Sequence, residues 1–226
     1  MRCLSSKPKP DAHGRRPVMG ALLALLAATL WLGGVAAGLG GLAGYATTAE
    51  PAPPAPGRWP LETRLELDPA RPTLVLFLHP RCPCSAATLT ELNRVLARVG
   101  PSAARVTVAV YAPTTEPAGW DRTPLRGRAA GLPGVCVVDD ADGQEARRFG
   151  AARSGHAVLY GPEGRLRFSG GLTASRGHEG DNAGADTVAA VLAGRPPVAE
   201  RTPTFGCEIV AGVAAGCPLC ASEGSP

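Results

Sequence analysis

Two cysteines separated by a single proline stand where an apolar strand gives way to a helix. The run TLVLFL at 73–78 has the length and composition of a buried parallel strand. Cys82, Pro83 and Cys84 follow it, and leucines then recur at helical spacing until Gly100 ends the pattern. A thiol at the start of a helix lies at the positive end of the helix dipole, which stabilises the thiolate. This junction therefore predicts reactive sulfur chemistry.

The rest of the pattern predicts a mixed α/β domain. The hairpin signal Gly-Pro-Glu-Gly at 161–164 joins two of the expected strands. The strands are expected at 71–79, 105–111, 134–140, 156–160 and 165–169. The helices are expected at 83–99, 125–131, 144–149 and 186–193.

The strand that ends directly before a cysteine pair resembles the active-site position of the thioredoxin superfamily. The blocks HPRCPCS (79–85) and FSGGLTASRGHEGDNAG (168–184) are similar to an exported, membrane-anchored subgroup, the RedB-type proteins. The resemblance covers roughly residues 60–206. It implies a thioredoxin-like three-layer sandwich, in which helices flank a central mixed sheet. It also implies thiol–disulfide oxidoreductase activity with Cys82 and Cys84 as the catalytic residues.

Two departures from the superfamily pattern affect this expectation. The usual motif places two residues between its cysteines, and here only Pro83 separates them. The superfamily also has a cis-proline before the strand that faces the active site, whereas the matching segment at 153–160 contains no proline. The residue beside the reactive sulfur is then expected near Gly155 or His156.

We expect Cys82 to be the nucleophile and Cys84 to resolve the mixed disulfide. With Pro83 at the first helical position, Cys82 should be the more exposed thiol of the pair and have the lower pKa. Arg81 would stabilise the anion if its side chain points inward, and His79 could do the same from the strand end. A bridge across one residue should be strained and therefore more oxidising.

Two other interpretations of the cysteine pair stay open. Closely spaced thiolates with His79 nearby suit soft ions such as Cu(I), so Cys82, Cys84 and His79 form an alternative metal site. The only methionines, Met1 and Met19, lie outside the domain, which disfavours copper handling. The second interpretation is that the cysteines are purely structural. No cofactor is predicted.

The other cysteines carry weaker signals. Cys136 lies in the middle of an apolar strand, which predicts a buried structural thiol. Cys3 lies in the leader and is either a lipidation site or an ordinary cysteine. Cys207, Cys217 and Cys220 lie in an irregular tail, which is either a disulfide-bonded or disordered tail, or an arm that exchanges electrons with the main pair. His178 is expected in a turn or capping role.

The first 46 residues predict an N-terminal membrane anchor. No charged residue occurs from 18 to 46, a run of 29 residues, and about 20 residues cross a bilayer core. Residues 1–17 carry a net charge of +4, the net charge of the whole chain, so no basic surface remains for nucleic acid. A basic leader should stay in the cytoplasm, which places a single-pass anchor in the inner membrane. A long cleaved signal peptide is the alternative.

Beyond the anchor, composition predicts three segments. Residues 47–60 are proline-rich and are expected to form an extended linker. The thioredoxin-like domain is expected at 61–200, and the irregular tail at 201–226. The domain then lies in the periplasm or outside the cell, where it meets a protein thiol or disulfide as its partner.

Overall fold

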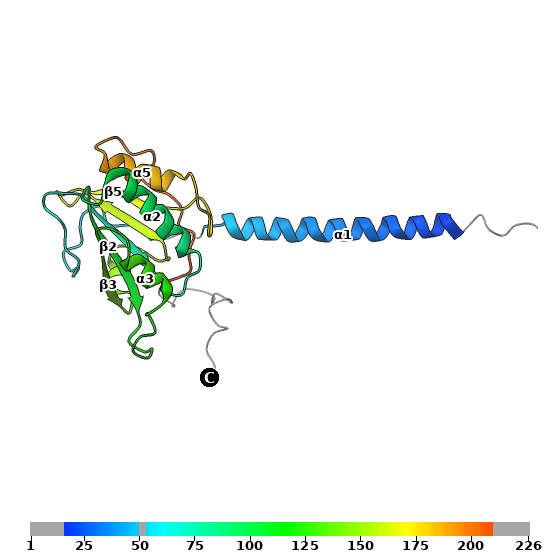
Figure 1. The fold of residues 1–226 in the computed structure, drawn as a ribbon, viewed down its shortest axis with the longest axis horizontal. Helices are drawn as coiled ribbons and strands as arrows, with labels where there is room; N and C mark the ends of the chain where they lie inside the picture. The colour runs from blue at the N-terminus through cyan, green and yellow to red at the C-terminus, as the bar shows by residue number, and fades with distance from the viewer. Residues whose placement is uncertain (1–15, 50–52, 210–226) are drawn as a thin grey trace, which may run out of the picture. The chain divides into compact units, whose positions relative to one another are not determined.

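The computed structural model describes residues 16–49 and 53–209, and the chain divides into two compact units at Tyr45–Ala46 (Figure 1). The helix α1 (Arg16–Thr47) makes up the described part of the first unit and ends two residues past the boundary. Its stretch from Val18 to Thr47 is 30 residues long, apolar and wholly unburied, which is compatible with a membrane anchor or a signal sequence. Most of the predicted basic leader, at 1–15, lies outside the described residues.

The second unit is built on a five-stranded mixed sheet with the order β3-β2-β1-β4-β5. The central strand β1 pairs in parallel with β2, and β2 pairs in parallel with β3. On the other side, β4 is antiparallel to both β1 and β5. The strands are β1 (Thr73–Leu78), β2 (Arg105–Ala112), β3 (Val135–Ala141), β4 (His156–Tyr160) and β5 (Leu166–Gly171).

Helices cover both faces of this sheet. One face packs against α2 (Ser85–Val99), α3 (Pro124–Ala130) and α5 (Ala183–Leu192), which lie together in Figure 1. The other face packs against α4 (Gln144–Arg148) and an aromatic cluster. The domain is therefore the thioredoxin-like three-layer sandwich that the sequence predicts.

Local chemistry sets the ends of the helices. Gly100, at φ 89°, ends α2 and donates its N–H to the Leu96 carbonyl. The side chain of Asn182 accepts the Ala185 N–H, so α5 begins three residues before the predicted start at 186. The helix α2 begins at Ser85, so Pro83 precedes the helix and does not occupy its first position as expected.

The segment before the domain packs against the sheet, although its composition predicts an extended linker. Trp59 makes edge-on contacts with Phe149 and Tyr160, at centroid distances of 5.0 and 5.2 Å. The Tyr160 hydroxyl donates to the Pro56 carbonyl at 2.8 Å. Residues 53–60 therefore contribute to the core, and aromatic burial explains why they do not extend freely into solvent.

The chain beyond α5 also packs against the sheet. We call residues 200–209 the C-terminal segment. Its Thr204, Phe205 and Ile209 are buried. The N–H of Gly171 in β5 donates to the Pro203 carbonyl at 3.2 Å. A Cβ at Gly171 would come too close to that carbonyl, which explains one glycine of the 168–184 block. The predicted irregular tail therefore starts with residues that belong to the folded domain.

Replacing Phe205 with alanine should lower the free energy of unfolding by about 3 kcal/mol, because a buried aromatic ring is lost. Val198→Ala is the control: Val198 is 67% exposed, and a change of less than about 0.5 kcal/mol is expected. Urea denaturation of the full-length chain in detergent micelles measures both values. Equal stabilities of Phe205→Ala and Val198→Ala would show that the C-terminal segment is not docked.

Candidate functional site

Cys82 lies in the turn that joins β1 to α2. Its N–H donates to the His79 carbonyl at 3.1 Å, and the Ser85 N–H donates to the Cys82 carbonyl at 3.2 Å. The residue is only 2% exposed, whereas Cys84, at the N-cap of α2, is half-buried. The expectation that Cys82 is the more exposed thiol is therefore wrong.

The sulfur of Cys82 is the acceptor for several donors. The backbone N–H of Cys207 points at Cys82 Sγ, with a nitrogen–sulfur distance of 3.3 Å. The thiols of Cys207 and Cys84 and the hydroxyl of Ser85 also hydrogen-bond to it. These bonds, that from the Cys207 thiol foremost, hold the pKa of Cys82 far below its usual range, while burial opposes them. Donors from two distant segments of the chain therefore converge on one buried sulfur.

A buried serine links the elements around this sulfur. Ser154 Oγ accepts the His79 N–H at 2.8 Å and lies 2.6 Å from Ser85 Oγ. The Ser154 N–H donates to the Cys207 carbonyl at 2.8 Å. Ser154 thereby ties together the end of β1, the start of α2 and the C-terminal segment. Ser154 was not among the candidate residues that the sequence indicated. The one sequence feature that could have pointed to it is its place in the proline-free segment 153–160.

His79 and Arg81 form an aromatic cluster beside the turn. The His79 ring stacks on Tyr111 at 5.6 Å and meets the edge of Trp120 at 5.6 Å. Burial lowers the pKa of His79, although the charge of Cys82 opposes this. The Arg81 guanidinium lies 4.7 Å from the centre of the Trp120 ring, a cation–π contact. Arg81 therefore points to the indole, and not inward as the anion-stabilising role requires.

Of the two residues expected near the sulfur, Gly155 and His156, the histidine directs its side chain to the face of the sheet away from α2. It is the first residue of β4, is 4% exposed, and its Nε2 lies 2.9 Å from Ser169 Oγ. Alternation along β4 puts His156 on the same face as Val158 and Tyr160, whose cluster packs on the side away from α2. Burial lowers the pKa of His156 to about 4, so the ring is neutral at neutral pH.

The remaining predicted residues have diverse positions. Cys136 is exposed on β3, which is one of the two edge strands of the sheet, so the expectation of a buried thiol is wrong. His178 is exposed and its N–H donates to the Ser175 carbonyl at 3.3 Å, which fits a turn role. Cys3, Cys217 and Cys220 lie outside the described residues.

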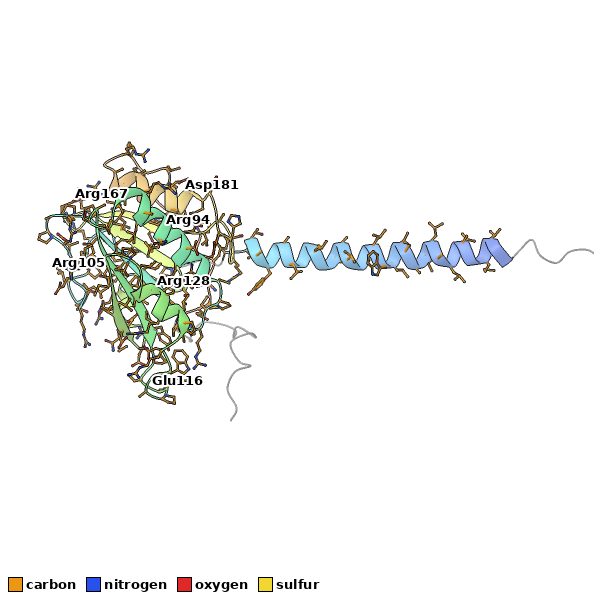
Figure 2. All side chains as sticks on the ribbon, viewed as in Figure 1. Arg94, Arg105, Glu116, Arg128, Arg167 and Asp181 are labelled. Carbon is orange, nitrogen blue, oxygen red and sulfur yellow. The ribbon has the colours of Figure 1, made fainter. Side chains whose placement is uncertain are left out.

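A shallow groove of about 390 Å³ opens beside Cys82. Pro80, Pro83 and Leu125 give it an apolar lining, and Arg128 adds a positive charge. Figure 2 shows Arg128 on α3, where its side chain hydrogen-bonds to Thr90 on α2. An apolar groove with a basic side chain can receive an extended peptide next to the sulfur.

The donor sets give no support to the metal alternative. Within 16–49 and 53–209, no group of three or more His, Cys, Asp or Glu side chains could hold a metal ion. Nδ1 of His79 already accepts the Arg81 N–H at 3.2 Å. With Nδ1 engaged in this way, Nε2 is the ring nitrogen of His79 that could still bind an ion.

Comparisons with known proteins bear on the fold alone. No protein-family model and no curated protein matches the chain. An uncharacterised conserved protein from Geobacillus kaustophilus superposes with a TM-score of 0.53 at 18% identity, over 74% of this chain and 93% of that one. A hypothetical protein from Sinorhizobium meliloti gives 0.51 at 24% identity, over 73% and 96%. A secreted Mycobacterium tuberculosis disulfide oxidoreductase gives 0.39 at 16% identity, over 57% and 84%.

The lowered pKa of Cys82 should be visible as thiolate absorbance. At pH about 6, the reduced chain should absorb at about 240 nm. Cys82→Ser should lose that absorbance, because cysteines with an ordinary pKa are protonated at this pH. Cys136→Ser, which changes an exposed thiol on β3, should keep it. Identical spectra for wild type and Cys82→Ser would mean that Cys82 is a thiol at that pH.

Buried His156 should make stability fall as the solution is acidified. Its pKa is depressed from 6.5 to about 4 in the folded chain, so the unfolded chain binds a proton first between those values. Acidification through that window should cost the wild type roughly 3 kcal/mol that His156→Gln does not lose. Urea denaturation at a series of pH values gives both slopes. Parallel profiles for the two chains would contradict the assignment.

Proposed function

We propose that this chain is a membrane-tethered thiol–disulfide oxidoreductase that acts outside the cytoplasm, with Cys82 as its nucleophile. The observation that carries the proposal is the buried sulfur of Cys82, which accepts hydrogen bonds from Cys84, Cys207 and Ser85. A thiolate is the form of cysteine that attacks disulfides. The rings of Tyr111 and Trp120 pack against His79 beside the turn that carries Cys82.

In the first step, the Cys82 thiolate attacks a disulfide of a partner protein. A bond forms between Cys82 Sγ and one partner sulfur, and the partner's own disulfide breaks to release a thiolate. A second thiol of this chain then attacks Cys82 Sγ and releases the remaining partner sulfur as a thiolate. The partner gains two electrons, and this chain acquires a disulfide. Cys84, in the same Cys-Pro-Cys pair, is one candidate for the second thiol.

The stabilised thiolate also bears on the direction of electron flow. Hydrogen bonds to the anion stabilise the reduced form, and a stabilised reduced form makes the corresponding disulfide a stronger oxidant. We therefore expect these two steps to run preferentially in reverse, so that partner thiols reduce the Cys82 disulfide. The groove beside Pro80 and Pro83 is where the partner's peptide would approach, because Cys82 itself lines that groove.

We assign the chain to the RedB-type subgroup on the blocks at 79–85 and 168–184. The apolar helix α1 supports an anchor in the inner membrane with the basic leader inside, so that the domain lies in the periplasm. Retention of the full-length chain in membranes after an alkaline carbonate wash is expected. Release into the periplasmic fraction with a new N-terminus would instead indicate a signal peptide.

Cys82→Ser should abolish disulfide exchange, whereas Cys136→Ser should leave the rate unchanged. The measurement is reduction of insulin by the full-length chain in detergent micelles with dithiothreitol as electron source. Exchange at the wild-type rate in Cys82→Ser would exclude the proposed nucleophile. Copper bound stoichiometrically to the anaerobically purified chain, and lost in Cys82→Ser, would favour metal handling instead.

A further inference from the structure

Cys207 is brought to the site by tertiary packing across 125 residues of sequence. Its backbone N–H lies 3.3 Å from Cys82 Sγ, and its thiol hydrogen-bonds to the same sulfur. This contact places a second thiol beside Cys82 Sγ, from where it can attack a mixed disulfide formed at that sulfur. Cys84 makes a similar contact with Cys82, so this site has two candidates for the second thiol.

The backbone around Cys207 is held on both sides. Its carbonyl accepts the Ser154 N–H at 2.8 Å, and two residues later the Ile209 N–H donates to the Ala152 carbonyl at 3.0 Å. Ile209 itself is 2% exposed. These contacts fix Cys207 next to Cys82 before any reaction occurs.

Gly206 makes the close approach possible. A Cβ at this position would overlap with the carbonyl of Ser154. The Gly206 carbonyl accepts hydrogen bonds from the guanidinium groups of Arg153 and Arg176, each at 3.2 Å. The peptide before Cys207 is thus seated closely against the domain, and two charged donors hold it there.

The two candidates differ in the ring that a disulfide would close. A bond between Cys82 and Cys84 closes a small ring around Pro83, and departures from the favoured disulfide geometry store strain. A bond between Cys82 and Cys207 joins segments that are distant in sequence, so it closes a large loop and is free of small-ring strain. The backbone of Cys207 is already held beside Cys82, with its nitrogen 3.3 Å from Cys82 Sγ.

We propose that Cys207 is the resolving cysteine of this site, the catalytic thiol that forms a disulfide with Cys82. The inference rests on the proposed function. In the resolving step, the Cys207 thiol gives its proton to solvent and its sulfur attacks Cys82 Sγ. The Cys82–Cys207 bond forms, the bond between Cys82 and the partner breaks, and the partner sulfur leaves as a thiolate. Cys84 then serves as a hydrogen-bond donor that stabilises the Cys82 thiolate.

The test uses the full-length chain in detergent micelles with Cys217 and Cys220 replaced by serine, so that neither can compete. This parent chain is reduced and then exposed to glutathione disulfide. Peptide mass spectrometry follows the glutathione adduct on Cys82 and the cross-links that replace it. The same time course is recorded for Cys84→Ser and Cys207→Ser in the parent background, with Cys136→Ser as the control.

The parent, Cys136→Ser and Cys84→Ser should each form the Cys82–Cys207 cross-link. Cys207→Ser should retain the Cys82 adduct for roughly tenfold longer or more, because the resolving thiolate is absent. The serine in Cys207→Ser can still donate a hydrogen bond to Cys82 Sγ, so thiolate absorbance at about 240 nm should persist. That absorbance separates loss of resolution from loss of the activated sulfur or of the fold.

The opposite pattern would overturn the inference: a persistent adduct in Cys84→Ser, with Cys207→Ser resolving at the parent rate through a Cys82–Cys84 bond. An adduct that never forms on Cys82 in any chain would overturn the proposed function together with the inference. The two failures are distinguishable, because only the second leaves Cys82 unmodified from the start.

Discussion

The buried sulfur of Cys82, whose pKa neighbouring donors lower, is the constraint around which this domain is organised. Moving an anion out of water is costly unless donors in the protein replace the lost hydration. The donors to Cys82 come from the first turn of α2 and from the C-terminal segment, while Ser154 fixes both relative to β1. Segments at opposite ends of the domain must therefore meet at one atom.

The parts of the fold that follow from local pattern could be predicted from the sequence. The run at 73–78 is wholly buried as β1, because strands on both sides and helices on both faces surround it. The glycines and proline at 161–164 predict the β4–β5 hairpin, since turn chemistry acts over a few residues. The junction of strand, cysteine and helix is likewise a local feature, so Cys82 and Cys84 could be singled out.

The features that depend on distant packing could not be predicted. Cys207 follows an irregular stretch with no periodic pattern, and only the contacts of its neighbours with the domain bring it to Cys82. Cys82 is also buried, although its place just before the helix predicted an exposed thiol. His156 shows a second limit. Matching the segment at 153–160 to the superfamily pattern placed this residue near the reactive sulfur. Side chains alternate between the two faces of a strand, and that of His156 lies on the face away from α2. Cys136 is exposed because β3 is an edge strand, which its apolar neighbours do not reveal.

The order of the donors along the chain has a consequence for biogenesis. Cys82 leaves the ribosome 125 residues before Cys207, whose thiol is its foremost donor. Until the C-terminal segment has been synthesised and has docked, the sulfur has only its near neighbours and the start of a helix to stabilise its charge. A nascent or interrupted chain therefore carries a thiol closer to ordinary reactivity. The lowest pKa of Cys82 is therefore expected only in the chain that has completed folding, which limits unwanted exchange during synthesis.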